Sequence, residues 1–137
     1  EAIIFLCTGN SCRSQMAEGI ASKNLKNYLI TSAGTLPQPV NPNAINSMKE
    51  IGIDISKNQS KKIDMDKLKT FDLIITLCGD AKDNCLNLSQ YKDKHIHWDI
   101  EDPAKFDDLS KEEISLKYSE VRDSIYNQIL SLKKISE

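Results

Sequence analysis

Residues 7–14 have the types and the spacing of a site that binds an oxyanion and attacks it. The segment reads Cys-Thr-Gly-Asn-Ser-Cys-Arg-Ser and lies between an apolar run and a helical pattern. Backbone N–H groups of a tight loop at a helix N-terminus point at a bound tetrahedral anion, and Arg13 can bind that anion through two N–H groups. The helix dipole and the arginine charge are expected to lower the pKa of the Cys7 thiol. The sequence therefore predicts a nucleophilic cysteine at the base of an anion-binding loop.

The remaining residues of this loop suit such a site. Gly9 and Asn10 tolerate the positive φ angles that a tight loop requires, and Ser14 can donate its hydroxyl to the Cys7 thiolate. The residues predicted to bind the substrate are Thr8, Gly9, Asn10, Ser11, Cys12, Arg13 and Ser14. A bare Cys-x5-Arg match also fits a buried strand-end cysteine near a surface arginine. A Walker-type nucleotide loop is disfavoured because the Gly-Lys-Ser/Thr ending is absent.

A second pair of cysteines, Cys78 and Cys85, frames a loop rich in Asp, Gly and Asn. Disulfide exchange needs an attacking sulfur that can reach its target, and a polar loop of this kind favours the necessary mobility. Two incidental core thiols are an alternative interpretation. A zinc site is less favoured, because the Cys-x6-Cys spacing exceeds the usual interval between structural zinc ligands.

Short apolar runs alternate with amphipathic stretches along the chain, which predicts strands alternating with helices. Strands are expected at 2–6, 28–33, 73–77 and 95–100, and helices at 14–26, between Asn41 and Gly52, at 64–70 and after Ser110. This pattern is typical of a three-layer α/β domain with a four-stranded parallel sheet. Ligands bind at the carboxyl ends of such strands, so Cys7 and Cys78 are expected to share one crevice.

Two helix starts are marked clearly. Asn41 and Pro42 provide an N-cap and a first helical residue, and Ser110 with Glu113 forms a capping box for the last helix. The apolar stripe of that last helix consists of Ile114, Tyr118, Val121, Ile125, Ile129 and Leu132. Its spacing of three and four residues predicts that this face is buried in the core.

The composition fits a single globular domain over residues 1–137. Its 20 acidic and 18 basic side chains give a formal charge of −2, which argues against nucleic-acid binding because such proteins carry a basic excess. The apolar runs are too short to span a bilayer, and a strand-like run near the start argues against a signal peptide. Clustered cysteines in a domain that needs no disulfides favour a reducing compartment, so a cytoplasmic protein is expected, with a monomer as the default.

The segment Cys7–Gly19 resembles the signature of thioredoxin-coupled arsenate reductases, which share the fold of the low-molecular-weight protein tyrosine phosphatases. Further blocks that match this family in order are Ser32–Gly34, Asn41–Pro42, Met48–Glu50, Ile53–Ser56, Thr76–Cys78, His97–Trp98, Asp102–Pro103 and Val121–Asp123. The resemblance covers nearly the whole chain. It implies a low-molecular-weight phosphatase-like fold, arsenate as substrate with phosphate or sulfate as mimics, and thioredoxin as the reducing partner.

The resemblance also implies a relay of three thiols. Cys7 attacks arsenate and forms a covalent arseno-cysteine, and Cys78 then attacks Cys7, which releases arsenite and leaves a Cys7–Cys78 disulfide. Cys85 attacks Cys78 in turn, and thioredoxin reduces the resulting Cys78–Cys85 disulfide. No metal or organic cofactor is required, since thiols supply the electrons. Cys12 has no part in this relay and is expected only to line the loop.

Asp102 stands before Pro103, where the family carries its general acid. An oxide leaving group departs poorly unless it is protonated, and a partly buried carboxylic acid above an anion site can keep its proton. Other acidic residues lie nearby in the sequence at Asp99, Glu101, Asp107 and Asp108. The Asp-Pro match favours Asp102 among them.

One segment departs from the family pattern. Some members bind a potassium ion beside the oxyanion loop through residues that match Asn10, Glu18 and Ser32. They also use a Thr-Ser-Asp segment, which here reads Gln59-Ser60-Lys61. An ammonium in place of a carboxylate removes a cation ligand. We therefore expect no specific potassium binding, with the charge of Lys61 standing in for that of the ion.

Other polar residues are expected to have no chemical role. His95 and His97 alternate along a predicted strand and face one side, as two metal ligands would. Two ligands do not make a closed metal site, so solvated strand-end histidines are expected. The charged stretches 57–69 and 91–94 are expected to be solvated faces and turns.

Two other functions fit parts of the sequence. A low-molecular-weight protein tyrosine phosphatase needs only the loop cysteine, the arginine and the acid. The second cysteine pair has no function in that reaction, and Ala104-Lys105 stand where phosphatase relatives carry an aromatic pair. Weak phosphatase side activity is nevertheless expected, because phosphate and arsenate have the same shape. A non-enzymatic redox sensor or anion-binding module is the third class, and steady arsenate turnover with thioredoxin, thioredoxin reductase and NADPH would exclude it.

Overall fold

The computed structural model describes residues 1–77 and 88–136, which contain a four-stranded parallel sheet. Its strands are β1 (Ala2–Cys7), β2 (Leu29–Gly34), β3 (Leu73–Thr76) and β4 (His95–His97), in the spatial order β2-β1-β3-β4. β1 therefore lies inside the sheet, paired with β2 on one side and β3 on the other. This position explains its unbroken apolar sequence, because both of its faces are buried. The predicted α/β fold with a four-stranded parallel sheet is confirmed.

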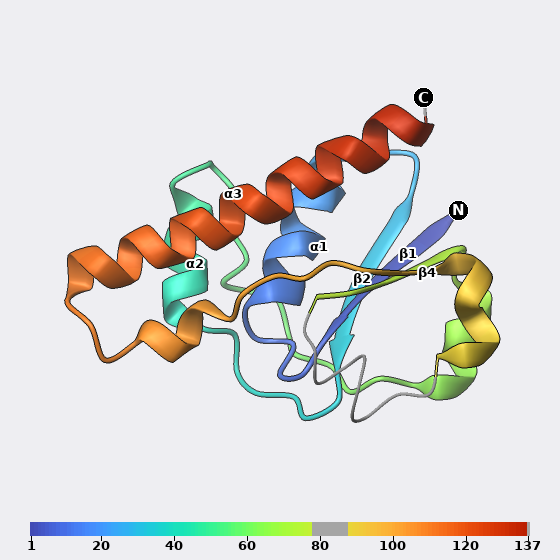
Figure 1. Ribbon diagram of the computed structural model, residues 1–137, viewed down its shortest axis with the longest axis horizontal. Coiled ribbons are helices and arrows are strands. Elements are labelled where there is room, and N and C mark those ends of the chain that lie inside the picture. The colour runs from blue at the N-terminus through green and yellow to red at the C-terminus, as the bar shows by residue number, and fades with distance from the viewer. Residues whose placement is uncertain (78–87, 137) are drawn as a thin grey trace.

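The α-helices cover one face of the sheet. They are α1 (Arg13–Asn24), α2 (Pro42–Lys49) and α3 (Lys111–Ser136), and α3 packs against both of the others, as Figure 1 shows. The predicted stripe of α3 faces this core: Tyr118, Val121, Ile125 and Ile129 are buried, and Ile114 and Leu132 pack against it. Of the helices in the described ranges, none combines the length and the hydropathy needed to cross a membrane.

Short 3₁₀ helices cover the other face of the sheet within the described residues. η1 (Met65–Thr70) and η3 (Ser89–Lys94) appear in Figure 1 as the green and yellow turns on the side of the sheet opposite α1 and α2. Their apolar side chains form a second, smaller core cluster with residues of β1 and β3. A further 3₁₀ helix, η4 (Pro103–Phe106), lies between β4 and α3. The sheet is thus enclosed on both faces, which gives the predicted three layers.

Two predicted elements differ from the observed ones. The strand expected over 95–100 ends at His97, after which Trp98 still donates its N–H to the carbonyl oxygen of Thr76 at 2.8 Å. The chain then leaves the sheet edge toward Asp102. The helix expected over 64–70 is the 3₁₀ helix η1, which is capped by the side chain of Asp64. The other predicted bounds lie close to the observed ones.

Candidate active site

The loop between β1 and α1 has the shape expected of an anion-binding site. Cys7 is the last residue of β1 and is buried. Asn10 takes the left-handed conformation, with a φ of 48°. Gly9 tolerates this conformation but does not adopt it, since among the described glycines only Gly52 has a positive φ. Asn10 makes the left-handed turn of this loop, and its side-chain amide forms hydrogen bonds through both Nδ2 and Oδ1.

The thiol of Cys7 contacts the hydroxyl of Ser14, with Sγ and Oγ 2.7 Å apart. The same Ser14 Oγ accepts a hydrogen bond from Asn10 Nδ2 at 2.8 Å. Because the amide donates to that oxygen, the hydroxyl proton of Ser14 is available for the sulfur. This is the contact that a hydroxyl donor to a Cys7 thiolate requires.

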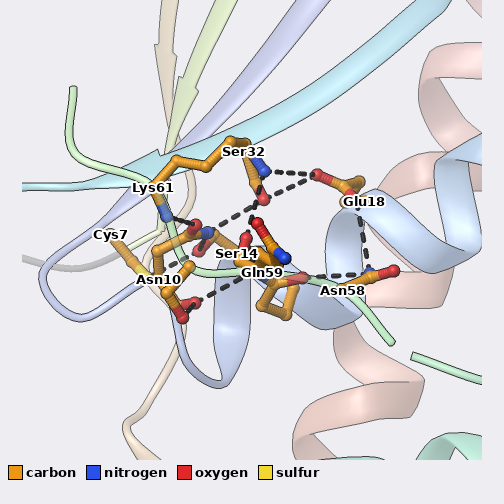
Figure 2. Close-up of polar contacts among 10 residues, drawn as sticks. Cys7, Asn10, Ser14, Glu18, Ser32, Asn58, Gln59 and Lys61 are labelled. Atoms are coloured by element: carbon orange, nitrogen blue, oxygen red, sulfur yellow. Dashed lines mark hydrogen bonds and ion pairs between the residues drawn. The ribbon is translucent and has the colours of Figure 1, made fainter. Parts of the chain in front are cut away.

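The buried amide of Asn10 connects three elements around the loop. Its Nδ2 donates to Ser14 on α1 and to Ser32 on β2, each at 2.8 Å, and its Oδ1 accepts the backbone N–H of Lys61 at 2.8 Å. Figure 2 shows these side chains gathered beside Cys7. The backbone carbonyl of Asn10 accepts a further bond from Gln15 Nε2 at 3.1 Å. Hydrogen bonds with α1, with β2 and with the backbone at Lys61 therefore hold the conformation of the loop.

Glu18 continues this network on α1. Its Oε1 accepts the hydroxyl of Ser32 at 2.7 Å and lies 3.7 Å from Lys61 Nζ, and its Oε2 accepts Asn58 Nδ2 at 3.3 Å (Figure 2). The ammonium also donates to the carbonyl oxygen of Gln59 at 3.3 Å. The Glu18 carboxylate therefore lies beside a cation of the same chain, the ammonium of Lys61.

These contacts test whether the residues fit a potassium ion. The three side chains that were matched to a potassium site, those of Asn10, Glu18 and Ser32, do converge. However, Asn10 Oδ1 is occupied by a backbone N–H, and Glu18 Oε1 is paired with the ammonium of Lys61. A second cation here would be repelled by that ammonium. The arrangement therefore does not fit a potassium site.

The N-terminus of α1 is left open toward the loop. Within the described part of the chain no side chain caps it at Cys12, and its first turn contains no acidic residue. Its first N–H groups are therefore available to an anion. Burial raises the pKa of the Cys12 thiol, and the negative charges of Asp102 and Cys7 act in the same direction. Cys12 accordingly remains a protonated thiol, which suits a lining residue.

Arg13 lies across the carboxyl ends of β3 and β4. Its Nη1 donates to the carbonyl oxygens of Ile100 at 2.9 Å and Leu77 at 3.4 Å, and its Nη2 lies 3.6 Å from the Asp102 carboxylate. The Asp102 side chain is 47% exposed, and its Oδ1 caps η4 by accepting the N–H of Ala104 at 3.0 Å. The structure therefore brings the predicted arginine and the predicted acid together.

The end of β3 lies next to the end of β1, as expected. Leu77 donates its N–H to the carbonyl oxygen of Leu6 at 2.9 Å, so the two strands finish at the same edge of the sheet. Cys78 and Cys85, which were predicted to act with Cys7, lie outside the described residues. Their part in the site remains a prediction from the sequence.

The end of β2 shapes the anion-binding loop, a role that was not predicted from the sequence. A Cβ on Gly34 would lie 2.5 Å from the carbonyl oxygen of Thr8 and 2.7 Å from the backbone nitrogen of Asn10. Only glycine allows the end of β2 to approach the loop this closely. The block Ser32–Gly34 appeared in the sequence only as a family match, and nothing in its local pattern indicated this contact.

The segment after β2 orients the peptide groups of the loop. The backbone N–H groups of residues 36, 38 and 41 donate to the carbonyl oxygens of Thr8, Gly9 and Ser11, each at 2.8 Å. Since the N–H and C=O of one peptide unit point in opposite directions, the N–H groups of those units face away from this segment. This orientation leaves the loop with donors on the side where an anion binds.

The two histidines of β4 are more enclosed than expected. His95 Nε2 and His97 Nδ1 lie 2.9 and 2.8 Å from the hydroxyl oxygen of Thr76, and both residues are half-buried. The two-residue period of β4 places both rings on the side where β3 presents that hydroxyl. Across residues 1–77 and 88–136, no group of three or more His, Cys, Asp and Glu side chains is arranged to hold a metal ion.

Known proteins match this chain over nearly its whole length, including the loop between β1 and α1. The family model described as low molecular weight phosphotyrosine protein phosphatase matches residues 2–135. An arsenate reductase of Halalkalibacterium halodurans is 47% identical over 130 residues, which cover 94% of this chain and 92% of that protein. An arsenate reductase of Bacillus licheniformis is 46% identical over 138 residues, which cover 100% of this chain and 98% of that protein. A solved structure of an arsenate reductase in the phosphate binding state superposes with a TM-score of 0.71 at 34% identity, covering 96% of this chain and 98% of that one.

Proposed function

Because the chain belongs to the low molecular weight phosphotyrosine protein phosphatase family, we propose that it reduces arsenate to arsenite with Cys7 as the nucleophile. The observation that carries this proposal is the similarity to arsenate reductases along nearly their entire length. The geometry around Cys7 supports it, since the loop combines a buried thiol, an open helix N-terminus and Arg13. Such a site binds a tetrahedral oxyanion and holds a sulfur atom against it.

In the first step the loop N–H groups and Arg13 bind arsenate, and the Cys7 thiolate attacks arsenic. A sulfur–arsenic bond forms while the bond from arsenic to one hydroxyl of the protonated arsenate breaks, and the departing hydroxyl takes a proton from Asp102 and leaves as water. The 3.6 Å approach of Asp102 to Arg13 supports its role as this acid, because Arg13 is the side chain that binds the anion. The hydroxyl of Ser14 stabilises the thiolate before the attack.

The next two steps move oxidation away from the loop. The Cys78 thiolate attacks Cys7, a disulfide forms, and the electron pair of the broken sulfur–arsenic bond passes to arsenic, which leaves as arsenite. Cys85 then attacks Cys78, which frees Cys7 as a thiol. The dithiol of thioredoxin reduces the Cys78–Cys85 disulfide, so the two electrons gained by arsenic come from thioredoxin. The adjacent ends of β1 and β3 support this route, because the chain reaches Cys78 directly after Leu77.

The test is NADPH consumption on adding arsenate to the protein with thioredoxin and thioredoxin reductase. We expect steady turnover in the wild type, none in Cys7→Ser and Cys78→Ser, and a single turnover in Cys85→Ser that leaves Cys7 and Cys78 oxidised. Cys12→Ala is the matched control, because it removes a thiol that the relay does not use. Turnover that survives Cys85→Ser, or that is lost equally in Cys12→Ala, would contradict the relay.

A second candidate function is phosphate monoester hydrolysis. The observations that favour it are the burial of Cys7 and the 3.6 Å approach of Arg13 to Asp102, since this reaction needs only these three residues. Phe106 provides the first aromatic ring after Asp102 in the chain. The ammonium groups of Lys105 and Lys117 lie over this ring, 5.2 and 4.7 Å from its centre. Hydrolysis of p-nitrophenyl phosphate that persists in Cys78→Ser, without arsenate turnover in the wild type, would make this the main activity.

We also propose that residues 1–137 form one domain that acts as a cytoplasmic monomer, without nucleic-acid or membrane partners. The balanced charge and the single sheet that collects every described strand support this. Light scattering of the purified protein tests the monomer directly, and a dimer mass at micromolar concentration would contradict it.

A further inference from the structure

Two carboxylates bracket the 3₁₀ helix η4, and each contacts a different part of the protein. Asp102 precedes the helix, caps it through the N–H of Ala104 and faces Arg13. Asp107 follows the helix and donates its own N–H to the carbonyl oxygen of Ala104 at 3.1 Å. The carboxylate of Asp107 accepts the phenolic hydroxyl of Tyr118, at 3.0 Å to Oδ1 and 3.3 Å to Oδ2. The short helix is therefore fixed to α3 at the end opposite Asp102.

Tyr118 provides a rigid anchor for this contact. It is fully buried on α3, and burial raises the pKa of its phenol, as does its hydrogen bond to the Asp107 carboxylate. The phenol therefore stays protonated and donates. Its oxygen also accepts Asn41 Nδ2 at 3.0 Å, and the backbone N–H of Asn41 donates to the carbonyl oxygen of Ser11 in the anion loop at 2.8 Å. A continuous path of hydrogen bonds thus joins the anion loop to Asp107.

The immediate surroundings of Asp102 do not hold its carboxylate firmly. Its side chain is 47% exposed, and its approach to Arg13 at 3.6 Å is longer than a hydrogen bond. The position of Asp102 depends instead on the backbone of η4, because the Asp102 carboxylate accepts a hydrogen bond from the N–H of Ala104. What fixes η4 relative to the loop therefore fixes the acid.

We propose that Tyr118 and Asp107 are positioning residues that hold Asp102 above the anion loop for proton transfer. The inference rests on the proposed role of Asp102 as general acid. Asp107 was one of several nearby acids in the sequence, but its carboxylate is turned to Tyr118 rather than to the loop. Neither positioning residue touches the substrate. They act by keeping Asp102 within reach of the departing oxygen, a requirement that tolerates little displacement.

Aryl phosphates give a readout that depends on the acid. As the Cys7 sulfur bonds to phosphorus and the phosphorus–oxygen bond breaks, the proton of Asp102 passes to the leaving phenol oxygen. Phenol leaves poorly and needs this proton, whereas p-nitrophenol leaves readily without it. For Tyr118→Phe we expect the kcat for phenyl phosphate to fall about tenfold, with KM nearly unchanged and the kcat for p-nitrophenyl phosphate reduced less than about twofold. Tyr126→Phe on the same helix is the matched control, and it should change neither.

Asp107 gives a second test that does not alter the core, since this residue is exposed. Asp107→Ala should reproduce the selective loss seen with Tyr118→Phe, while Asp107→Asn keeps an oxygen that accepts the phenol and should recover most of the activity. The double variant Tyr118→Phe/Asp107→Ala should be no worse than either single variant, because both remove the same contact. The same ranking is expected for single-turnover arsenite release.

Asp102→Asn separates failure of this inference from failure of the proposed function. If Asp102→Asn loses phenyl phosphate activity selectively and neither Tyr118→Phe nor Asp107→Ala does, the positioning role is overturned and the general acid stands. If Asp102→Asn shows no selective loss and no effect on arsenite release, the acid role itself is wrong. Equal losses on both aryl phosphates in Tyr118→Phe would show that the hydroxyl serves folding alone, and would also overturn the inference.

Discussion

The N-termini of α1 and α3 are built in opposite ways. At α3, Ser110 Oγ accepts the N–H of Glu113 at 3.3 Å and donates its hydroxyl to the Glu113 carboxylate at 3.0 Å. Two acidic residues, Glu112 and Glu113, stand in that first turn, where they face the positive end of the helix dipole. At α1 the described residues provide no capping side chain, and the first turn has no acid.

The difference indicates which helix end is kept for a ligand. A capped end has its donors satisfied and its dipole balanced, and it contributes only to stability. An uncapped end leaves donors and positive potential unused, which costs stability unless an anion binds. The proposed arsenate site is therefore located at the N-terminus of α1, where the described residues provide neither a capping side chain nor an acidic residue in the first turn.

Supplying α1 with its own anion should give the largest effect. In Cys12→Asp a carboxylate stands at the N-cap of α1, beside the site of the bound oxyanion. At about 5 Å and an effective dielectric constant of about 20, two like charges repel by roughly 3 kcal/mol, which is more than a hundredfold in affinity. We expect the Kd for phosphate, measured by isothermal titration calorimetry, to rise at least about a hundredfold. Cys12→Ala should leave it unchanged, and a Kd in Cys12→Asp within tenfold of the wild type would contradict the comparison.

Moving the loop away from its open helix end should give the next largest effect. Gly34→Ala places a Cβ 2.5 Å from the backbone of Thr8, so either β2 or the loop must shift. We expect the free energy of unfolding in urea to fall by about 1–3 kcal/mol, and arsenate turnover to fall with it. Gly9→Ala is a control for stability, because its Cβ would meet only side-chain atoms, Ser11 Oγ at 3.1 Å and Gln38 Cγ at 3.6 Å. Equal effects of the two variants would show that the close approach of β2 does not matter.

Removing the cap of α3 should affect stability alone. Ser110→Ala deletes the oxygen that accepts the N–H of Glu113, which should lower the free energy of unfolding by about 1 kcal/mol. Since this cap lies outside the proposed arsenate site, kcat and KM for arsenate should stay within error of the wild type. A loss of activity without a loss of stability would mean that the two helix ends do not divide their roles as proposed.

The smallest effect expected is that of potassium. Lys61 already places an ammonium 3.7 Å from Glu18 Oε1, beside the network that supports the loop. Arsenate turnover should therefore be equal in potassium sulfate and sodium sulfate at the same ionic strength. Activity several-fold higher in potassium would show that a second cation enters despite Lys61.

Much of the loop and the sheet followed from local sequence. The alternation of apolar runs and helical patterns predicted the strands, and the Cys-x5-Arg spacing predicted which strand end carries the loop. The contact between Cys7 and Ser14 was also predictable, because both residues belong to one short segment whose ends are a strand and a helix. The capping box of α3 involves only residues three apart, and it was recognised for the same reason.

What the sequence did not indicate depends on residues far apart in the chain. The spacing of Tyr118 on α3 predicted correctly that its ring is buried, but hydrophobic periodicity gives no information about a hydroxyl at the end of a ring. That hydroxyl finds partners in Asp107 and Asn41 only after α2, α3 and η4 have packed together. The need for glycine at position 34 likewise arises from the approach of β2 to Thr8, which no local pattern encodes.

The central position of β1 has a consequence for how the chain is made. Of the four strands of the sheet, β1 is synthesised before the others, and β2 can pair with one of its edges soon afterwards. Its other edge, buried in the finished sheet, stays open until β3 has been synthesised, since Ile3 pairs with Leu73. At about 5–20 residues per second, this interval lasts several seconds. During that time the nascent chain exposes an apolar strand edge, so a ribosome-bound chaperone that covers apolar segments should raise the yield of folded protein.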